Sequence, residues 1–172
     1  MIRPGFSSYN EDVPFAFIHR EGADRMIQGQ SLTIRELVDQ QTVKEPYTLT
    51  PETTVRQAAS AMVDYQVSAV AVVDADGVLI GILSEKDISH LVATGGDPEI
   101  ITVGEIMTEN PITVNLGTPL GKTAQDMLRF NIRHLPVVEN CRPLSTISMR
   151  DVLSMLLEQF EAEGELLRAD VD

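Results

Sequence analysis

The feature that most constrains the fold is an internal repeat, because the second half of the chain restates the first in several blocks. Val73 matches Val138 at an offset of 65 residues, and Asp87 matches Asp151 at an offset of 64. The second copy therefore lacks one residue between these two matches. An offset kept over this length predicts one supersecondary unit used twice. Two facing copies form pseudo-symmetric clefts, where ligands commonly bind.

The composition is that of a soluble globular chain with an acidic surface. Hydrophobic residues make up 43% and charged residues 23% of the 172 residues, and the formal net charge is −13. This charge argues against nucleic acid or an anionic membrane as partner, since both are bound through Lys and Arg. Any phosphate-bearing ligand requires a local basic patch.

Two further counts bear on location and redox chemistry. Cys141 is the single cysteine, which excludes an intrachain disulfide and a thiolate zinc cluster. The first residues contain no apolar stretch of signal-peptide length, and no apolar run approaches the length of a membrane span. We therefore expect a cytoplasmic protein.

The repeat divides the chain into four segments. We expect an N-terminal arm over residues 1–30, a first repeat over 31–95, a second repeat over 96–158, and an acidic C-terminal tail or helix end over 159–172. The arm matches neither repeat and contains the short apolar run Phe15–Ile18. We expect it to pack on its own or a neighbouring subunit.

Hydrophobic spacing predicts a leading helix and then a β-α-β-β-α order in each repeat. The first repeat is expected to contain a helix around Thr33–Gln41, strands at Tyr47–Leu49, Val67–Val73 and Val78–Leu83, a helix capped by Thr53 or Thr54, and a helix from Ser84 to about Thr94. The second is expected to contain a helix at Val103–Thr108, a strand at Pro111–Val114, a helix at Gly117–Phe130 with Leu120, Ala124, Met127 and Leu128 inward, strands at His134–Glu139 and Leu144–Ile147, and a helix from Ser148. The fold class is α/β (α+β), with two pseudo-symmetric repeats packed sheet to sheet as one module.

Both repeats carry Ser-x-x-Asp where a strand leads into a helix. The residues are Ser84 and Asp87 in the first repeat and Ser148 and Asp151 in the second. One interpretation is a capping box. The other is a ligand site, because a helix N-terminus attracts anions and a carboxylate one turn later can accept hydrogen bonds from a ribose diol. The occurrence of the motif in both repeats favours the ligand interpretation.

With these motifs the chain resembles the paired cystathionine-β-synthase-type (CBS) regulatory domains, also called Bateman modules. The similarity covers roughly residues 32–158 and is strongest in Gly81–Asp87, close to the family's Gly-h-x-Thr/Ser-x-x-Asp (h apolar), in Val103–Val114 and in Ile132–Val138. The resemblance implies an adenosine-containing ligand, such as AMP, ADP, ATP, NAD(H) or S-adenosylmethionine, in the cleft between the repeats.

The resemblance also implies roles for particular residues. Ribose hydroxyls would bind to Asp87 and Asp151, with the ribose or phosphate near Ser84 and Ser148. Phosphate would bind to Arg133, His134 and Arg150, with Lys86 as a weaker candidate. Adenine would be held by groups around Ser68, Ala69, Ile112 and Thr113. A solvated strand end is the alternative interpretation for Arg133 and His134.

Two positions depart from the family pattern. Ser145 replaces the motif glycine of the second repeat, and the strand around Ser68 carries no base where the second repeat has Arg133 and His134. The two clefts are therefore not equivalent. In this family each ribose carboxylate faces the basic strand of the partner repeat. We expect the Asp87 cleft to be the more cationic one and to hold the more phosphorylated or more tightly bound ligand.

Several functions remain open at this point. The three histidines lie far apart, and the chain contains no HExxH, P-loop, nucleophile elbow or G-x-G-x-x-G, so we expect neither an enzyme nor a metal site. We favour a non-catalytic sensor that acts on a regulated protein. The alternative is a structural dimerisation module that lacks a physiological ligand, and a small enzyme is the third hypothesis.

The final helix carries an apolar stripe that bears on assembly. Its members stand at helical spacing and are Val152, Leu153, Leu156, Leu157 and Phe160. The stripe either packs on its own domain or contacts a second copy. Because the stripe is longer than the sheet that it covers, we expect a homodimer.

Overall fold

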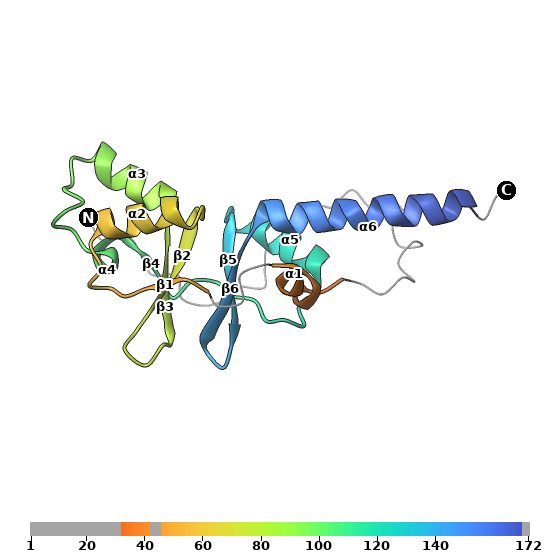
Figure 1. Cartoon of the computed structure of the whole chain (residues 1–172), viewed down its shortest axis with the longest axis horizontal. Coiled ribbons are helices and arrows are strands. Elements are labelled where there is room, and N and C mark those ends of the chain that lie inside the picture. The colour runs from red at the N-terminus through yellow and green to blue at the C-terminus, as the bar shows by residue number, and fades with distance from the viewer. Residues whose placement is uncertain (1–31, 42–45, 170–172) are drawn as a thin grey trace, which may run out of the picture. The chain divides into compact units, whose positions relative to one another are not determined.

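The sequence repeat becomes a β-α-β-β-α unit followed by an α-β-β-α unit in the computed structural model, which describes residues 32–41 and 46–169, with side chains placed up to residue 162. The expected arm over 1–30 lies outside these residues. The first repeat contains β1 (Thr48–Leu49), α2 (Val55–Asp64), β2 (Ala69–Val73), β3 (Leu79–Ser84) and α3 (Glu85–Ala93). The second contains α5 (Leu120–Arg129), β5 (His134–Glu139), β6 (Arg142–Ser148) and α6 (Met149–Ala169). Figure 1 shows the two β-hairpins side by side.

The strands form two sheets. One has the order β1-β2-β3-β4, where β4 (Thr108–Glu109) comes from the start of the second repeat, and the other pairs β5 with β6. All five residues of β2 are buried, as its continuous apolar run predicts. The two sheets meet where β2 contacts β6, and the backbone N–H of Leu79 donates to the carbonyl of Cys141 at 2.9 Å. The expected sheet-to-sheet module is confirmed.

The strand expected at Pro111–Val114 is wrong in extent. It is reduced to a single parallel bridge between Val114 and Val137, although Val114 is itself buried. Pro111 has no N–H to donate to a ladder, and the two residues between Pro111 and Val114 are exposed. This segment therefore crosses beside β5 without becoming a full strand.

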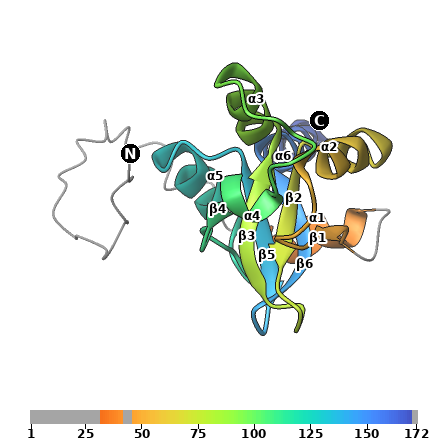
Figure 2. The same ribbon diagram turned by 90° about the vertical axis from the view of Figure 1, so that its left-hand side faces the viewer.

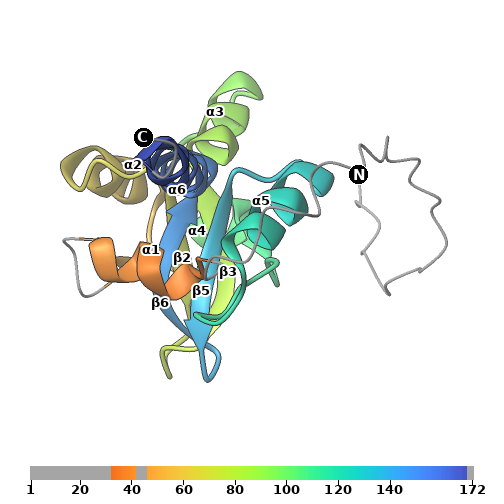
Figure 3. The ribbon, with the colours of Figure 1, turned by 90° about the vertical axis from the view of Figure 1, so that its right-hand side faces the viewer.

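Each leading helix packs on the repeat that it does not precede in sequence. The first leading helix, α1 (Ile34–Gln40), places Ile34 in the core cluster of the second repeat, and the Ile34 N–H donates to the carbonyl of Thr118 at 2.9 Å. The second, α4 (Val103–Ile106), places Val103 in the core of the first repeat. The N–H of Val103 donates to the carbonyl of Thr53 at 2.8 Å. Figures 2 and 3 show α4 and α1 on opposite ends of the paired hairpins.

This exchange was not expected, because the sequence places each leading helix directly before its own repeat. It ties the two repeats together, since the core of each is completed by a segment that belongs to the other in sequence. Both leading helices begin with a Thr whose backbone and side chain donate to a Glu three residues later, in Thr33–Glu36 and Thr102–Glu105. The same local signal therefore starts both helices.

The amphipathic helices follow the expected spacing with one error. Thr54 caps α2, and its hydroxyl accepts from the N–H of Gln57 at 3.2 Å. In α5 the buried residues are Leu120, Thr123, Ala124 and Met127. The expected inward position of Leu128 is wrong, since 71% of its surface is exposed. It follows directly after Met127 and falls off the buried stripe of a 3.6-residue period.

The last helix, α6, buries only part of its apolar stripe. Val152 is fully buried and Leu156 packs partly against the core. The remaining members, here called the α6 stripe, are Leu153, Leu157 and Phe160, which are 46%, 61% and 66% exposed. Among the described helices none is long and apolar enough to cross a membrane.

Candidate functional site

The two Ser-x-x-Asp motifs have the same geometry. The Asp87 Oδ2 accepts from the backbone N–H and the hydroxyl of Ser84, at 2.9 and 2.6 Å. The Asp151 Oδ2 accepts from the same groups of Ser148, at 2.8 and 2.7 Å. The capping interpretation is thus confirmed as geometry. Each carboxylate uses one oxygen in the cap, and within the described residues its Oδ1 accepts no hydrogen bond.

A backbone hydrogen bond joins the start of one strand to the start of each of these helices. The N–H of Glu85, the first residue of α3, donates to the carbonyl of Ser68 at 3.1 Å. The N–H of Met149, the first residue of α6, donates to the carbonyl of Arg133 at 2.9 Å. In the strand registers, Ala69 lies opposite Ser84 and His134 lies opposite Ser148. The structure therefore brings Ser68 and Ala69 to the Asp87 end, and Arg133 and His134 to the Asp151 end.

His134 joins the two ends to each other. Its Nε2 lies 3.0 Å from the hydroxyl of Ser68, so a side chain of the second repeat contacts the residue before β2 of the first. Burial lowers the pKa of His134, the charge of Arg133 lowers it further, and Glu85 and Asp151 oppose that shift. Both repeats thus contribute charge to the surroundings of one imidazole.

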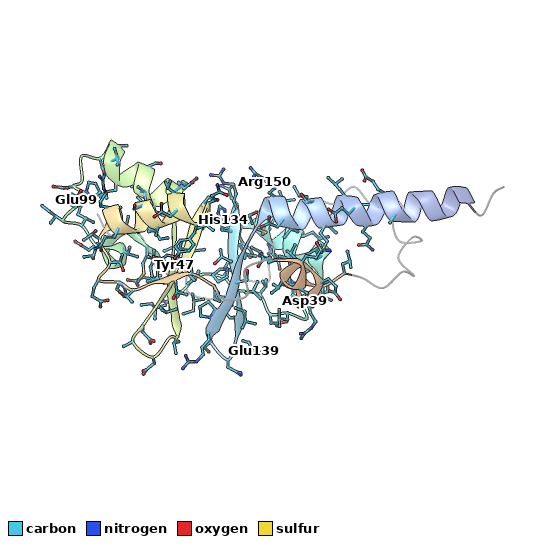
Figure 4. The ribbon with its side chains drawn as sticks, in the orientation of Figure 1. Asp39, Tyr47, Glu99, His134, Glu139 and Arg150 are labelled. Atoms are coloured by element: carbon cyan, nitrogen blue, oxygen red, sulfur yellow. The ribbon has the colours of Figure 1, made fainter. Side chains whose placement is uncertain are left out.

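The other basic candidates are exposed around this point. Arg133, Arg150 and Lys86 each lie at the surface, and none forms an ion pair with a carboxylate in the described part of the chain. Figure 4 shows Arg150 at the start of α6, near His134. These cations are available to an anion, even though the chain as a whole carries a net charge of −13.

The candidates from the second repeat's crossing segment are less well connected. Ile112 is 44% exposed and Thr113 is exposed, and neither forms a hydrogen bond with another candidate in the described residues. Their position follows from Val114, which bridges to Val137 in β5.

The substitution of the motif glycine has a local explanation. A Cβ at Gly81 would lie 2.4 Å from the Sδ of Met107 and 3.2 Å from the carbonyl oxygen of Thr108, so a side chain at this position would force its neighbours to shift. At the matching position of the second repeat, the hydroxyl of Ser145 donates to the Oε1 of Gln41 at 2.5 Å, and Ser145 is buried. The serine at this position thus has a polar partner in Gln41, which follows α1, whereas Gly81 lies against Met107, which follows α4.

A pocket of about 210 Å³ lies beside Asp151 and was not expected from the sequence. It runs between α1 and α6, which contact each other. Its lining residues are Leu37, Gln40, Gln41, Asp151, Ser154, Met155 and Glu158. The sequence feature related to this pocket is Ser145 in place of the motif glycine, because Ser145 bonds to the lining residue Gln41. That relation exists only because α1 packs on the second repeat. Within the described residues no cluster of His, Cys, Asp and Glu could hold a metal ion.

Comparison with known proteins identifies the architecture. The sequence model of the CBS domain matches residues 34–94 and 103–158. The chain belongs to the CBS-domain family. Both repeats match, so the described unit is a CBS-domain pair, and the resemblance inferred from the motifs is confirmed.

Individual relatives agree with this assignment. The CBS domain-containing protein CBSCBSPB2 of Arabidopsis thaliana is 34% identical over 119 residues, which are 69% of this chain and 22% of that protein. A CBS-domain-containing protein of Agrobacterium tumefaciens has a solved structure with a TM-score of 0.66 and 30% identity, over 72% of this chain and 98% of that one. The CBS-domain pair of protein MJ0100, solved with 5′-methylthioadenosine and S-adenosyl-L-methionine, has a TM-score of 0.66 and 25% identity, over 74% and 97%. The chain spans about a quarter or less of the length of the curated relatives that it matches first.

Proposed function

We propose that this CBS-domain pair is a non-catalytic regulatory module that binds an adenosine nucleotide, AMP, ADP, ATP or NAD(H), between its repeats and senses energy or metabolite status. The observation that carries the proposal is the pair of capped carboxylates, Asp87 and Asp151. Each cap fixes one oxygen and leaves Oδ1 without a hydrogen bond from the described residues. A ribose diol is a suitable donor for that oxygen, since a hydrogen bond to an ionised carboxylate is strong.

The surroundings of each carboxylate support this choice of ligand. The positive end of the helix dipole at the starts of α3 and α6 favours an anion, and the exposed bases Arg133 and Arg150 supply counter-charge without a competing ion pair in the described residues. The structural relative MJ0100 holds two adenosine compounds in its CBS-domain pair. An adenosine moiety on Asp and a phosphate on Arg fit these groups best.

The two clefts should differ in the ligand that they prefer. In the family arrangement, Arg133 and Arg150 both face a phosphate whose ribose is bound to Asp87. Arg offers planar bidentate contacts that Lys does not. The Asp151 cleft draws on Lys86 from the first repeat and on Ser68, which carries no charge. We therefore propose that the more phosphorylated or more tightly bound ligand occupies the Asp87 cleft.

Sensing follows from the position of the site between repeats. His134 of the second repeat already contacts Ser68 of the first, and a ligand that replaces or adds to this contact binds some arrangements of the repeats better than others. Such differential binding shifts the population of those arrangements. A regulated protein partner would respond to this shift. We also propose that the α6 stripe is a homodimer contact.

A thermal-denaturation screen tests the proposal. Purified protein is heated alone and with AMP, ATP, NADH or S-adenosylmethionine, with GMP as a matched control. A ligand at 100 times its dissociation constant adds about 2.7 kcal/mol, which for a chain of this size raises the melting temperature by about 5–10 °C. A shift with an adenosine compound and none with GMP is expected. No shift with any compound would instead favour a structural dimerisation module, which the exposed α6 stripe supports.

A further inference from the structure

The imidazole of His134 lies where the two repeats and two helix starts come together. Its Nε2 is 3.0 Å from the hydroxyl of Ser68 in the first repeat. The carbonyl of Ser68 accepts the N–H of Glu85, the first residue of α3, at 3.1 Å. In its own repeat His134 begins β5, opposite Ser148, the residue before α6. An anion bound at either helix start is therefore close to this ring.

One ring nitrogen of His134 remains open. Within the described residues Nδ1 forms no hydrogen bond, and no buried side-chain nitrogen or oxygen there lacks a partner. Nδ1 therefore reaches the surface, although the ring is partly buried. A neutral imidazole donates from one nitrogen, whereas an imidazolium donates from both and carries a positive charge. Protonation would thus make the open side of the ring a charged donor.

Charged groups of both signs face His134, from its own segment and from α3 and α6. Burial lowers the pKa of His134, and the charge of Arg133 lowers it further. Glu85 of α3 and Asp151 of α6 oppose that shift. Arg150, at the start of α6, lies near the ring as well (Figure 4). Because the net direction of the pKa is downward from 6.5, the free imidazole is largely neutral at about pH 7.

A bound phosphate reverses this balance. A phosphate monoester carries about −1.5 to −2 charges at neutral pH, and Arg133 and Arg150 are the exposed bases that would hold it. The anion compensates Arg133, the charge that opposes protonation of His134, and places a negative charge beside the ring. An opposite charge within about 4–6 Å shifts a pKa by about 1–3 in favour of the charged form.

We propose that His134 takes up a proton from solvent when a phosphate-bearing ligand binds in the Asp87 cleft, so that this module binds nucleotide more tightly as the pH falls. The inference rests on the proposed function, because it requires a nucleotide phosphate near Arg133. In the imidazolium, Nε2–H donates to the hydroxyl oxygen of Ser68 and Nδ1–H donates to the phosphate. Adenosine has no phosphate and causes no proton uptake.

An NMR titration of the histidine side chains in the full chain measures this protonation directly. Imidazole shifts are followed over about pH 5–8, where histidine titrates, without ligand, with saturating AMP and with saturating adenosine. His134 is assigned through its backbone resonances. The expected result is that AMP raises the measured pKa of His134 by about 1 or more, whereas adenosine does not. His90 is the internal control, since it is exposed in the last turn of α3, and its titration curve should not change.

Calorimetric titration with AMP measures the consequence for affinity. The affinity of the wild type divided by that of His134→Gln should be about threefold higher at about pH 6 than at about pH 8. Protonation of AMP itself affects both proteins equally and cancels in this ratio. Urea unfolding verifies that the variant is folded, and the NMR titration of the wild type decides the question if it is not.

Three outcomes would count against the inference. AMP binding without a rise in the pKa of His134, or an equal rise with adenosine, overturns it while the proposed function stands. Binding of adenosine without binding of AMP has the same meaning, because the phosphate then contributes nothing. If neither AMP, adenosine, ATP nor NADH binds, proton uptake is overturned together with the proposed function.

Discussion

Replacing Asp87 by Ala separates the two roles of this carboxylate, because capping acts without ligand and ribose binding does not. The substitution removes the two hydrogen bonds that Oδ2 accepts from Ser84, at 2.9 and 2.6 Å. Loss of a helix cap costs about 0.5–2 kcal/mol. Since Ser84 and Asp87 are only partly buried, the expected loss of stability without ligand is about 1 kcal/mol.

The effect on binding is larger. A hydrogen bond to a charged group contributes about 1.5–3 kcal/mol, so the loss of the ribose contact weakens binding about 10- to 150-fold. Asp87→Asn is the matched control: an amide oxygen can still accept from the Ser84 N–H, so the cap is largely kept, while the charge that holds the ribose is lost. The same pair of substitutions applies to Asp151.

Urea unfolding without ligand and calorimetric titration with AMP measure the two effects separately. The expected pattern is a lower unfolding free energy in Asp87→Ala, little change in Asp87→Asn, and weaker AMP binding in both. Unchanged AMP affinity in the alanine variants of both Asp87 and Asp151 would refute the reasoning and leave these residues as helix caps alone.

Further predictions concern charge, packing, pH and assembly. Arg133→Ala should weaken AMP binding, measured by calorimetry, and leave adenosine binding unchanged. An equal loss of affinity for both would mean that Arg133 maintains the shape of the cleft and does not bind the phosphate. Gly81→Ala should cost about 1–3 kcal/mol in urea unfolding, because the added methyl overlaps with Met107; a neutral result would contradict this packing. Burial lowers the pKa of His134, so the unfolded state binds its proton first and this contribution to stability is lost as the pH falls below about 6.5. Stability of the wild type should therefore decline more between pH 7 and 5 than that of His134→Gln, and equal slopes would oppose the assignment. Light scattering should give about twice 18.9 kDa if the α6 stripe forms a dimer, whereas the monomer mass would exclude it at that concentration.

Local signals in the sequence predict the elements well where one residue type decides the outcome. Thr54 and Ser84 cap the helices that they precede, and the apolar run that ends at Val73 is a buried strand. The hairpin turn after β5 has positive φ angles at Asn140 and Cys141, as a two-residue turn of type I′ requires. In each case the physical cause is contained within a few residues.

Tertiary packing decides the features that the sequence did not predict. The position of Ile34 in the core of the second repeat depends on contacts with residues more than 80 positions away, such as Thr118. The pocket beside Asp151 exists because α1 packs on α6, so the sequence gives no reason to group the lining residues of α1 with those of α6. The motif residues themselves were recognisable because each Ser-x-x-Asp is a local unit that occurs twice.

The central claim, that an adenosine nucleotide binds where both repeats meet, is tested most directly by a backbone NMR titration with AMP. We predict saturable shifts that centre on the amides around Ser68, Ser84 and Arg133, with smaller changes far from the helix starts. The double variant Asp87→Asn/Asp151→Asn should show these shifts only at much higher AMP concentration. Saturable shifts that centre elsewhere on the described unit, or no shifts at millimolar AMP, ATP and NADH, would contradict the account.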